Sequence, residues 1–151
     1  MKPSADGFTL IELIVILMLT GILAVTALPR LLDSRVMDDR GFHDTTLAAL
    51  RYAQKAAIAK RRTVCLTFTT TSVTARVASG DPPSTVCDTD LIGPNGTQPY
   101  TVMARGSSAY TGTPTAFSFS ALGQAGQSQT IQVANVANSI TVEAATGYVH
   151  E

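Results

Sequence analysis

The chain contains 151 residues, with 11 Lys and Arg, 11 Asp and Glu, and a formal net charge of zero. That length suffices for one domain and is too short for two of ordinary size. Eight of the 11 basic residues lie between Arg30 and Arg62, whereas the sequence from residue 63 onward is rich in Thr, Ser, Gly and Val. Because those residue types favour strands and turns, we predict a helical N-terminal third followed by a small β-rich module.

Residues 8–28 form an apolar run of 21 residues whose single charge is that of Glu12. As an α-helix this run would be about 30 Å long, roughly the thickness of a bilayer's hydrocarbon core. A short polar leader precedes the run, so a cut after residue 7 would leave the apolar helix on the mature chain. In a secretory signal the cut follows the apolar stretch instead. We therefore expect a leader peptide at 1–7 and a transmembrane and assembly helix at 8–29.

Glu12 needs a cationic partner within this run. A carboxylate at the centre of a membrane-spanning helix costs about 2.5–3.5 kcal/mol, and less near a helix end. Cleavage after Gly7 would create a free ammonium on Phe8, which lies about 6 Å along the helix from Glu12. The two charges could pair within one helix or between neighbouring helices.

The residues GFTLIEL at the head of an apolar helix resemble the prepilin signature of type IV pilins and type II secretion pseudopilins. In that family a membrane-embedded aspartyl peptidase, the prepilin peptidase, cuts after the glycine and methylates the new N-terminal amine. The resemblance implies that cleavage follows Gly7, that Phe8 becomes the N-methylated residue, and that Glu12 acts in assembly. It also favours pairing of the Glu12 carboxylate with the Phe8 amine of a neighbouring subunit.

Several residues should modify the helical part of the chain. Pro29 should kink or locally unwind the first helix near Val25, because proline lacks a backbone donor and crowds the preceding turn. Thr20 and Thr26 are expected to bond back to the preceding turn, and Gly21 to allow close helix packing. A second joint is expected at Gly41.

An amphipathic helix is predicted over residues 30–62, packed by its apolar face onto the β-rich module. Its basic residues fall largely outside that face. The apolar residues recur at helical spacing and are Leu47, Leu50, Ala53, Ala57 and Ile58.

The β-rich module at 63–151 begins with the alternating segments TVCLTFTT and SVTARVAS, which predict a hairpin with Val64, Leu66 and Phe68 on one face. A loop rich in Pro, Gly and Asp is expected at 80–99. The alternating segments TAFSFSA, TIQVAN and SITVEAA and a final turn bring the expected total to about six strands. The predicted fold class is α+β, with one long N-terminal helix packed on a small antiparallel sheet, as in pilins.

Downstream segments refine the family resemblance. RYAQKAAIAKRRTVCLTF, FSFSALG and ITVEAATGYVH are similar to the GspH/FimT group of minor pilins and pseudopilins, and ILAVTALPR is similar to minor pilins of the MSHA system. The segment at 80–108 has no counterpart in this resemblance. The likeness leaves open whether the chain serves a type IV pilus or a type II secretion pseudopilus.

The two cysteines, Cys65 and Cys87, suggest a disulfide if the module leaves the cytoplasm, or else two buried thiols. A Cys/His metal site is not expected, because the chain has no third cysteine and its histidines, His43 and His150, are far apart in sequence. Three loop acids, Asp81, Asp88 and Asp90, lack the spacing of an EF-hand. No metal and no cofactor are predicted.

Three classes of function were weighed from these features. The first is a structural minor pilin or pseudopilin, whose partners are other pilin subunits and the prepilin peptidase. The alternative is a DNA-binding minor pilin for DNA uptake, with Lys60, Arg61 and Arg62 as candidate phosphate contacts, joined by Arg51, Lys55 and Arg105. The competing interpretation of those cations is a solvated helix end that complements the helix dipole. An enzyme is not expected, because no nucleophile, phosphate loop or paired acids are apparent.

The expected location is the inner membrane, crossed once, with a periplasmic globular module that later enters a pilus or pseudopilus. The basic residues on either side of the apolar run do not define this orientation. It follows from the family resemblance and the cysteine pair.

Overall fold

The structure is a computed structural model that describes residues 9–32 and 35–151, with the side chains of residues 26–32 left out. The chain forms two compact units, one containing the first helix and the other comprising residues 35–151. The first unit contains helix α1, Leu10–Leu32. This helix continues through Val25 and Pro29, so the backbone is not unwound there, and a kink at Pro29 stays a prediction.

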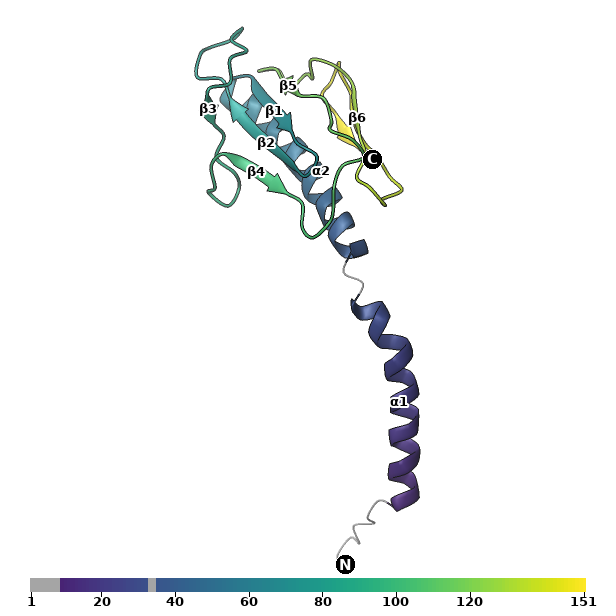
Figure 1. The fold of residues 1–151 in the computed structure, drawn as a ribbon. Coiled ribbons are helices and arrows are strands. Elements are labelled where there is room, and N and C mark those ends of the chain that lie inside the picture. The colour runs from purple at the N-terminus through teal and green to yellow at the C-terminus, as the bar shows by residue number, and fades with distance from the viewer. Residues whose placement is uncertain (1–8, 33–34) are drawn as a thin grey trace, which may run out of the picture. The chain divides into compact units, whose positions relative to one another are not determined.

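The second unit opens with helix α2, Arg35–Lys60, which Figure 1 shows lying along one face of the sheet that contains β1 and β2. Four of the five predicted apolar residues on this helix are buried, namely Leu47, Leu50, Ala53 and Ala57. The prediction for Ile58 was wrong, because its side chain is 48 % exposed. Ile58 packs against the surface turn at Gly123, where an added Cβ would lie 2.6 Å from its Cδ1, and not into the core.

The expected joint at Gly41 is absent, because α2 continues through this residue. A glycine inside a helix costs about 1 kcal/mol relative to alanine. Burial of a phenylalanine contributes about 1.5–3 kcal/mol, and Phe42 next to the glycine is 3 % exposed. Packing of the neighbouring residue therefore outweighs the local preference.

Two antiparallel sheets lie beside α2, instead of the single sheet predicted. The five-stranded sheet has the order β3-β2-β1-β5, and β4 also pairs with β2. Its strands are β1 (Val64–Phe68), β2 (Ser72–Val77), β3 (Thr89–Asp90), β4 (Tyr100–Met103) and β5 (Phe117–Phe119). The second sheet has the order β6-β7-β8, with β6 at Gln129–Ile131, β7 at Ile140–Val142 and β8 at Val149–His150.

The predicted hairpin is confirmed as β1 and β2, which pair from Val64 opposite Val77 to Phe68 opposite Val73. β3 and β4 were not predicted and fall in the segment at 80–108 without a family counterpart. With these two strands, the α+β fold class is confirmed and the number of strands rises to eight.

One hydrophobic core joins α2 to both sheets. Its fully buried side chains include Leu50, Ala53 and Ala57 from α2, Val64, Leu66, Val73 and Phe119 from the first sheet, and Ile131, Ile140, Val142 and Val149 from the second. The hydroxyl of Thr46 lies 3.0 Å from that of Tyr110, which satisfies two polar groups inside this core. Burial raises the pKa of Tyr110 to about 12, so its hydroxyl stays protonated.

Candidate functional site

The N-terminal end of α1 is capped by Thr9, three residues before Glu12. The backbone N–H of Glu12 donates to the Thr9 hydroxyl at 3.3 Å, and the N–H of Leu13 donates to the Thr9 carbonyl at 3.2 Å. Thr9 is thus the N-cap residue, and Glu12 is the third residue of the helix, where a carboxylate also complements the helix dipole. Sequence reasoning missed this role, although the spacing Thr-x-x-Glu at 9–12 is its signal. The predicted cleavage pair, Gly7 and Phe8, lies outside the described residues.

Every described side chain of α1, from Leu10 to Val25, is exposed. The large apolar ones include Leu10 at 77 %, Leu13 at 56 % and Val25 at 77 %. A helix that is apolar all round is normally buried in a core, a bundle or a membrane. None of the helices in the described part of the chain combines the length and hydrophobicity that crossing a membrane requires.

A shallow groove on α1 surrounds Gly21. It has a volume of about 500 Å³ and is lined by Leu17, Met18, Gly21, Ile22 and Val25. A Cβ added at Gly21 would have no atom within 4 Å. The residue before Gly21 is Thr20, whose hydroxyl donates to the carbonyl of Ile16 in the preceding turn at 2.8 Å, as predicted. The side chain of Thr26 lies outside the described part of the structure.

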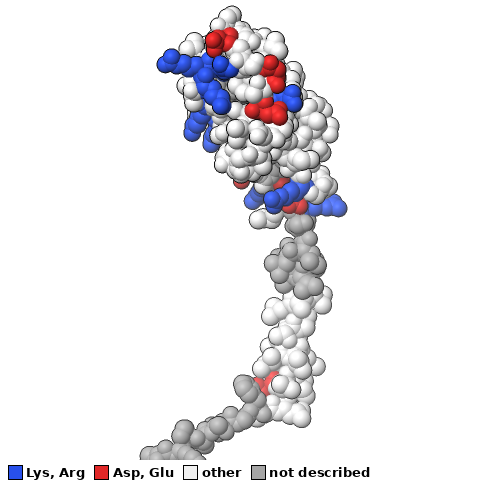
Figure 2. Space-filling view, turned by 90° about the vertical axis from the view of Figure 1, so that its left-hand side faces the viewer, with Lys and Arg blue, Asp and Glu red and all other residues white. Residues whose placement is uncertain are grey.

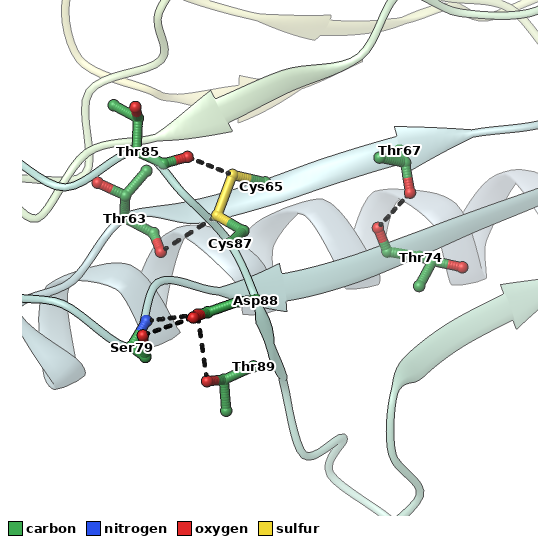
Figure 3. Close-up of a disulfide and its surroundings, with 9 residues drawn as sticks. All are labelled: Thr63, Cys65, Thr67, Thr74, Ser79, Thr85, Cys87, Asp88 and Thr89. Atoms are coloured by element: carbon green, nitrogen blue, oxygen red, sulfur yellow. Dashed lines mark hydrogen bonds between the residues drawn. A yellow bond between two sulfur atoms is a disulfide. The ribbon is translucent and has the colours of Figure 1, made fainter.

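Cys65 on β1 and Cys87 in the loop between β2 and β3 form a disulfide, with an S–S distance of 2.04 Å (Figure 3). Beside it, Asp88 accepts hydrogen bonds from the Ser79 backbone N–H at 3.0 Å and from the Ser79 hydroxyl at 2.7 Å. These hydrogen bonds, the one from the hydroxyl above all, lower the pKa of Asp88. The loop is therefore attached to the first sheet by both a covalent bond and a charged side chain.

The three loop acids that lack the spacing of an EF-hand make separate contacts. Asp81 forms an ion pair with Arg62 at 3.4 Å, and Asp90 forms one with Arg76 at 3.2 Å. Asp88 instead accepts hydrogen bonds from Ser79. Within the described residues these acids do not gather into a metal-binding group.

Some of the cationic side chains on and just after α2 make hydrogen bonds or ion pairs, whereas others have neither among the described residues. Arg62 donates to the carbonyls of Ser79 and Ala78 and pairs with Asp81, so it fastens the disulfide loop to the helix end. The Nε of Arg51 likewise donates to the carbonyl of Val149 at 3.1 Å. Figure 2 shows Lys and Arg side chains gathered at the upper end of the globular unit, with acidic side chains close by. Of the six candidate phosphate contacts, all but Arg62 are exposed, including Arg51 with its hydrogen bond to Val149 and the cations Lys55, Lys60, Arg61 and Arg105.

Arg61 closes α2 in a left-handed conformation, with φ of 52°. The N–H of Arg61 donates to the carbonyl of Ile58 at 3.2 Å, and that of Arg62 to the carbonyl of Ala57 at 3.1 Å. These two bonds make a Schellman motif, in which glycine is the usual residue at the left-handed position. A bulky cation occupies this position at a cost in backbone strain.

Comparison with known proteins adds a family motif and a fold. Residues 2–28 match the prokaryotic N-terminal methylation motif. Two crystal forms of the Pseudomonas aeruginosa type IV minor pilin FimU share the fold. The first has a TM-score of 0.53 at 12 % identity, over 78 % of this chain and 90 % of FimU. The second has a TM-score of 0.50 at 9 % identity, over 74 % and 90 %.

In its N-terminal motif and its fold, the chain is similar to type IV pilins. No curated protein matches it in sequence. At these identities the likeness to FimU concerns the fold alone. The pilin-like chain therefore combines a methylation-type N-terminus with the helix-on-sheet architecture that its sequence predicted.

The structure brings together only some of the predicted site residues. It joins Cys65 to Cys87 and places Lys60, Arg61 and Arg62 at one helix end, where only Arg62 of the three takes part in an ion pair among the described residues. Glu12 lies at the start of α1 with the Thr9 cap beside it. The pairing of Glu12 with the Phe8 amine stays a prediction.

Proposed function

We propose that this pilin-like chain is a structural subunit of a type IV pilus or a type II secretion pseudopilus and assembles through its N-terminal helix. The observation that carries the proposal is a capped α1 whose described side chains are exposed, with one acid in its first turn. Apolar side chains on every face of a helix require burial by lipid or by other helices. A role in assembly supplies both surroundings in succession, and it requires no catalytic chemistry.

In this proposal the leader at 1–7 is removed by a prepilin peptidase, and Phe8 becomes the methylated N-terminus. The helix at 8–29 then holds the subunit in the inner membrane, with the amphipathic segment at 30–62 and the β-rich module at 63–151 on the periplasmic side. On recruitment, the Glu12 carboxylate of one subunit meets the Phe8 amine of its neighbour. Leaving lipid for a helix bundle gains little hydrophobic free energy, so packing and this charge pair must select the register.

The test is mass spectrometry of the chain recovered from sheared surface fibres or from a pseudopilus preparation. We expect the N-terminal peptide to begin at Phe8 and to carry one methyl group on its amine. A mature chain that begins at any other residue, or that is recovered only outside fibres, would contradict the proposal.

DNA binding is a second candidate function, favoured by the exposure of Lys60 and Arg61. Phosphate contacts release counterions, so such binding must weaken steeply with salt. Fluorescence anisotropy of a labelled DNA duplex, measured over a salt series, distinguishes the two functions. A DNA-binding subunit would lose affinity in the double variant Lys60→Gln/Arg61→Gln and keep it in Arg76→Gln, whose cation is paired with Asp90.

A further inference from the structure

A buried imidazole on α2 faces two carboxylates from different parts of the globular unit. The His43 side chain is 4 % exposed, and its Nδ1 lies 3.2 Å from the Asp44 Oδ1 and 3.8 Å from the Glu151 Oε1. These three atoms all lie within 4.8 Å of one another. The group therefore places one nitrogen and two oxygen donors around a common point.

The His43 ring makes no other hydrogen bond or ion pair among the described residues. Its Nε2 is buried without a hydrogen-bond partner. Burying a polar ring without full hydrogen bonding is unfavourable. The sole polar contacts of this ring in the described structure are thus the two carboxylates toward which Nδ1 points.

Glu151 is held so that one of its oxygens faces the ring. Asn138 Nδ2 donates to the Glu151 Oε2 at 3.3 Å, which leaves Oε1 on the side of His43. Outer groups that orient a ligand in this way are a regular part of metal sites. Asp44 and Glu151 are 74 % and 42 % exposed, so both side chains can adjust toward an ion.

The group borders a cavity that can admit an ion and water from solvent. The cavity has a volume of about 380 Å³, and its lining includes His43, Asp44, Asn138 and Glu151. Arg40 also lines it, and this guanidinium would compete with a cation for the carboxylates. Asp44 follows His43 directly in the helix, where adjacent residues do not share a face. The Asp44 side chain therefore bends toward the His43 ring, which brings its Oδ1 within 3.2 Å of Nδ1.

We propose that His43, Asp44 and Glu151 bind a divalent transition-metal ion, Zn²⁺ best, through Nδ1 and one oxygen of each carboxylate, with water completing the coordination. Imidazole and carboxylate are common zinc ligands, with bonds of about 2.0–2.2 Å. Tetrahedral coordination at that length needs donor atoms about 3.3–3.6 Å apart. The distances from Nδ1 to Asp44, 3.2 Å, and to Glu151, 3.8 Å, lie close to that range. The bound ion ties the chain after β8 to helix α2.

The test uses the full-length chain purified in detergent and titrated with zinc chloride, by calorimetry and by the midpoint of thermal unfolding. We expect Zn²⁺ to raise the midpoint, because an ion that binds only the folded state stabilises it by mass action. Magnesium chloride at equal concentration should raise it less. Asp44→Asn and Glu151→Gln should each weaken zinc binding by about tenfold or more. These two variants replace exposed side chains and avoid the folding defect that His43→Gln could cause.

The matched control is Glu143→Gln, which removes a nearby carboxylate that pairs with His150 at 3.4 Å. This variant should bind zinc like the original chain. Cobalt supplies a second readout, because Co²⁺ held by one nitrogen and two oxygens changes its visible absorption spectrum. Equal zinc binding by the Asp44, Glu151 and Glu143 variants, or no zinc binding at micromolar concentrations, would overturn the proposal in favour of a plain ion pair.

Discussion

Glu12 has two separate roles, one in the start of helix α1 and one, in our proposal, in subunit assembly. As the third residue of α1, Glu12 donates its backbone N–H to the Thr9 cap, and its carboxylate complements the helix dipole. As the single charge in an apolar run, it is also the group that a neighbouring amine would recognise. The backbone hydrogen bond to Thr9 is kept with a neutral glutamine, whereas recognition of an amine requires the charge. The two roles are therefore separable by substitution.

Asp88 predicts a pH dependence of stability for the disulfide loop. Its pKa in the folded state is lowered, chiefly by the Ser79 hydroxyl. A carboxyl whose folded pKa is lowered stabilises the protein above its unfolded pKa of about 3.9 and loses that effect as pH falls through the folded value. Asp88→Asn should therefore lower the free energy of unfolding at neutral pH. Urea titrations should find the two proteins converging below pH 4, and a gap that persists in acid would contradict this.

Arg61 predicts a stabilising substitution. An L-residue in the left-handed region costs about 1–2 kcal/mol, and glycine there costs about 0.5–1 kcal/mol through the unfolded chain. Arg61→Gly should therefore raise the free energy of unfolding by about 0.5–1 kcal/mol. Arg61→Ala, which removes the charge and keeps the strain, should give no such gain. Thermal unfolding of the two variants compares strain with charge, and equal midpoints would show that strain is absent.

At the scale of elements, the Gly21 groove predicts an assembly defect without a folding defect. No atom lies within 4 Å of a Cβ built at this position, so Gly21→Leu should leave the subunit stable. In a helix bundle the added side chain would hold a neighbouring helix away, because small residues permit close approach. We expect less of the leucine variant in sheared fibres by immunoblot, at unchanged cellular levels. Gly21→Ala serves as the milder control, and normal incorporation of the leucine variant would exclude close packing here.

The disulfide predicts a loss of stability confined to the globular unit. The bond closes a loop with a sequence separation of 22, which in the chain-entropy model corresponds to about 3 kcal/mol. Cys65→Ser/Cys87→Ser should reduce the free energy of unfolding by about that amount. Denaturant titration of the variant checks this, with the reduced original chain as its control. A loss well below 1 kcal/mol would mean that Arg62 and Asp88 alone hold the loop.

Local sequence patterns predicted those elements in which the spacing of apolar residues alone indicates the buried face. The alternation of Val64, Leu66 and Phe68 sufficed for the first hairpin, and the spacing of Leu47, Leu50 and Ala53 for the buried face of α2. Ile58 continued the same spacing but meets a surface turn, which depends on where residue 123 lies in space. β3 is two residues long and pairs with β2, so its formation depends on a partner strand and not on its own sequence.

At the scale of the whole molecule, the division into two sheets was not predictable from single segments. β5 joins the first sheet and β6 the second, although both are strands of three residues within stretches that alternate apolar and polar side chains. Their assignment depends on long-range pairing. The group of His43, Asp44 and Glu151 was missed for the same reason, since residue 151 reaches the helix only through the fold. The Thr9 cap, in contrast, could be predicted from the sequence, because the spacing Thr-x-x-Glu at 9–12 is local.

The most direct test of the account is incorporation of Glu12→Gln into fibres, compared with Thr9→Ala and the original chain. Glutamine keeps the backbone N–H that donates to Thr9 and is accepted at the third helical position, so Glu12→Gln keeps the helix start and removes the charge. Thr9→Ala keeps the charge and weakens the helix start by about 0.5–2 kcal/mol. Quantitative immunoblots of sheared fibres should give a large loss for Glu12→Gln and a smaller one for Thr9→Ala. Normal incorporation of Glu12→Gln would contradict assembly through the Glu12 carboxylate.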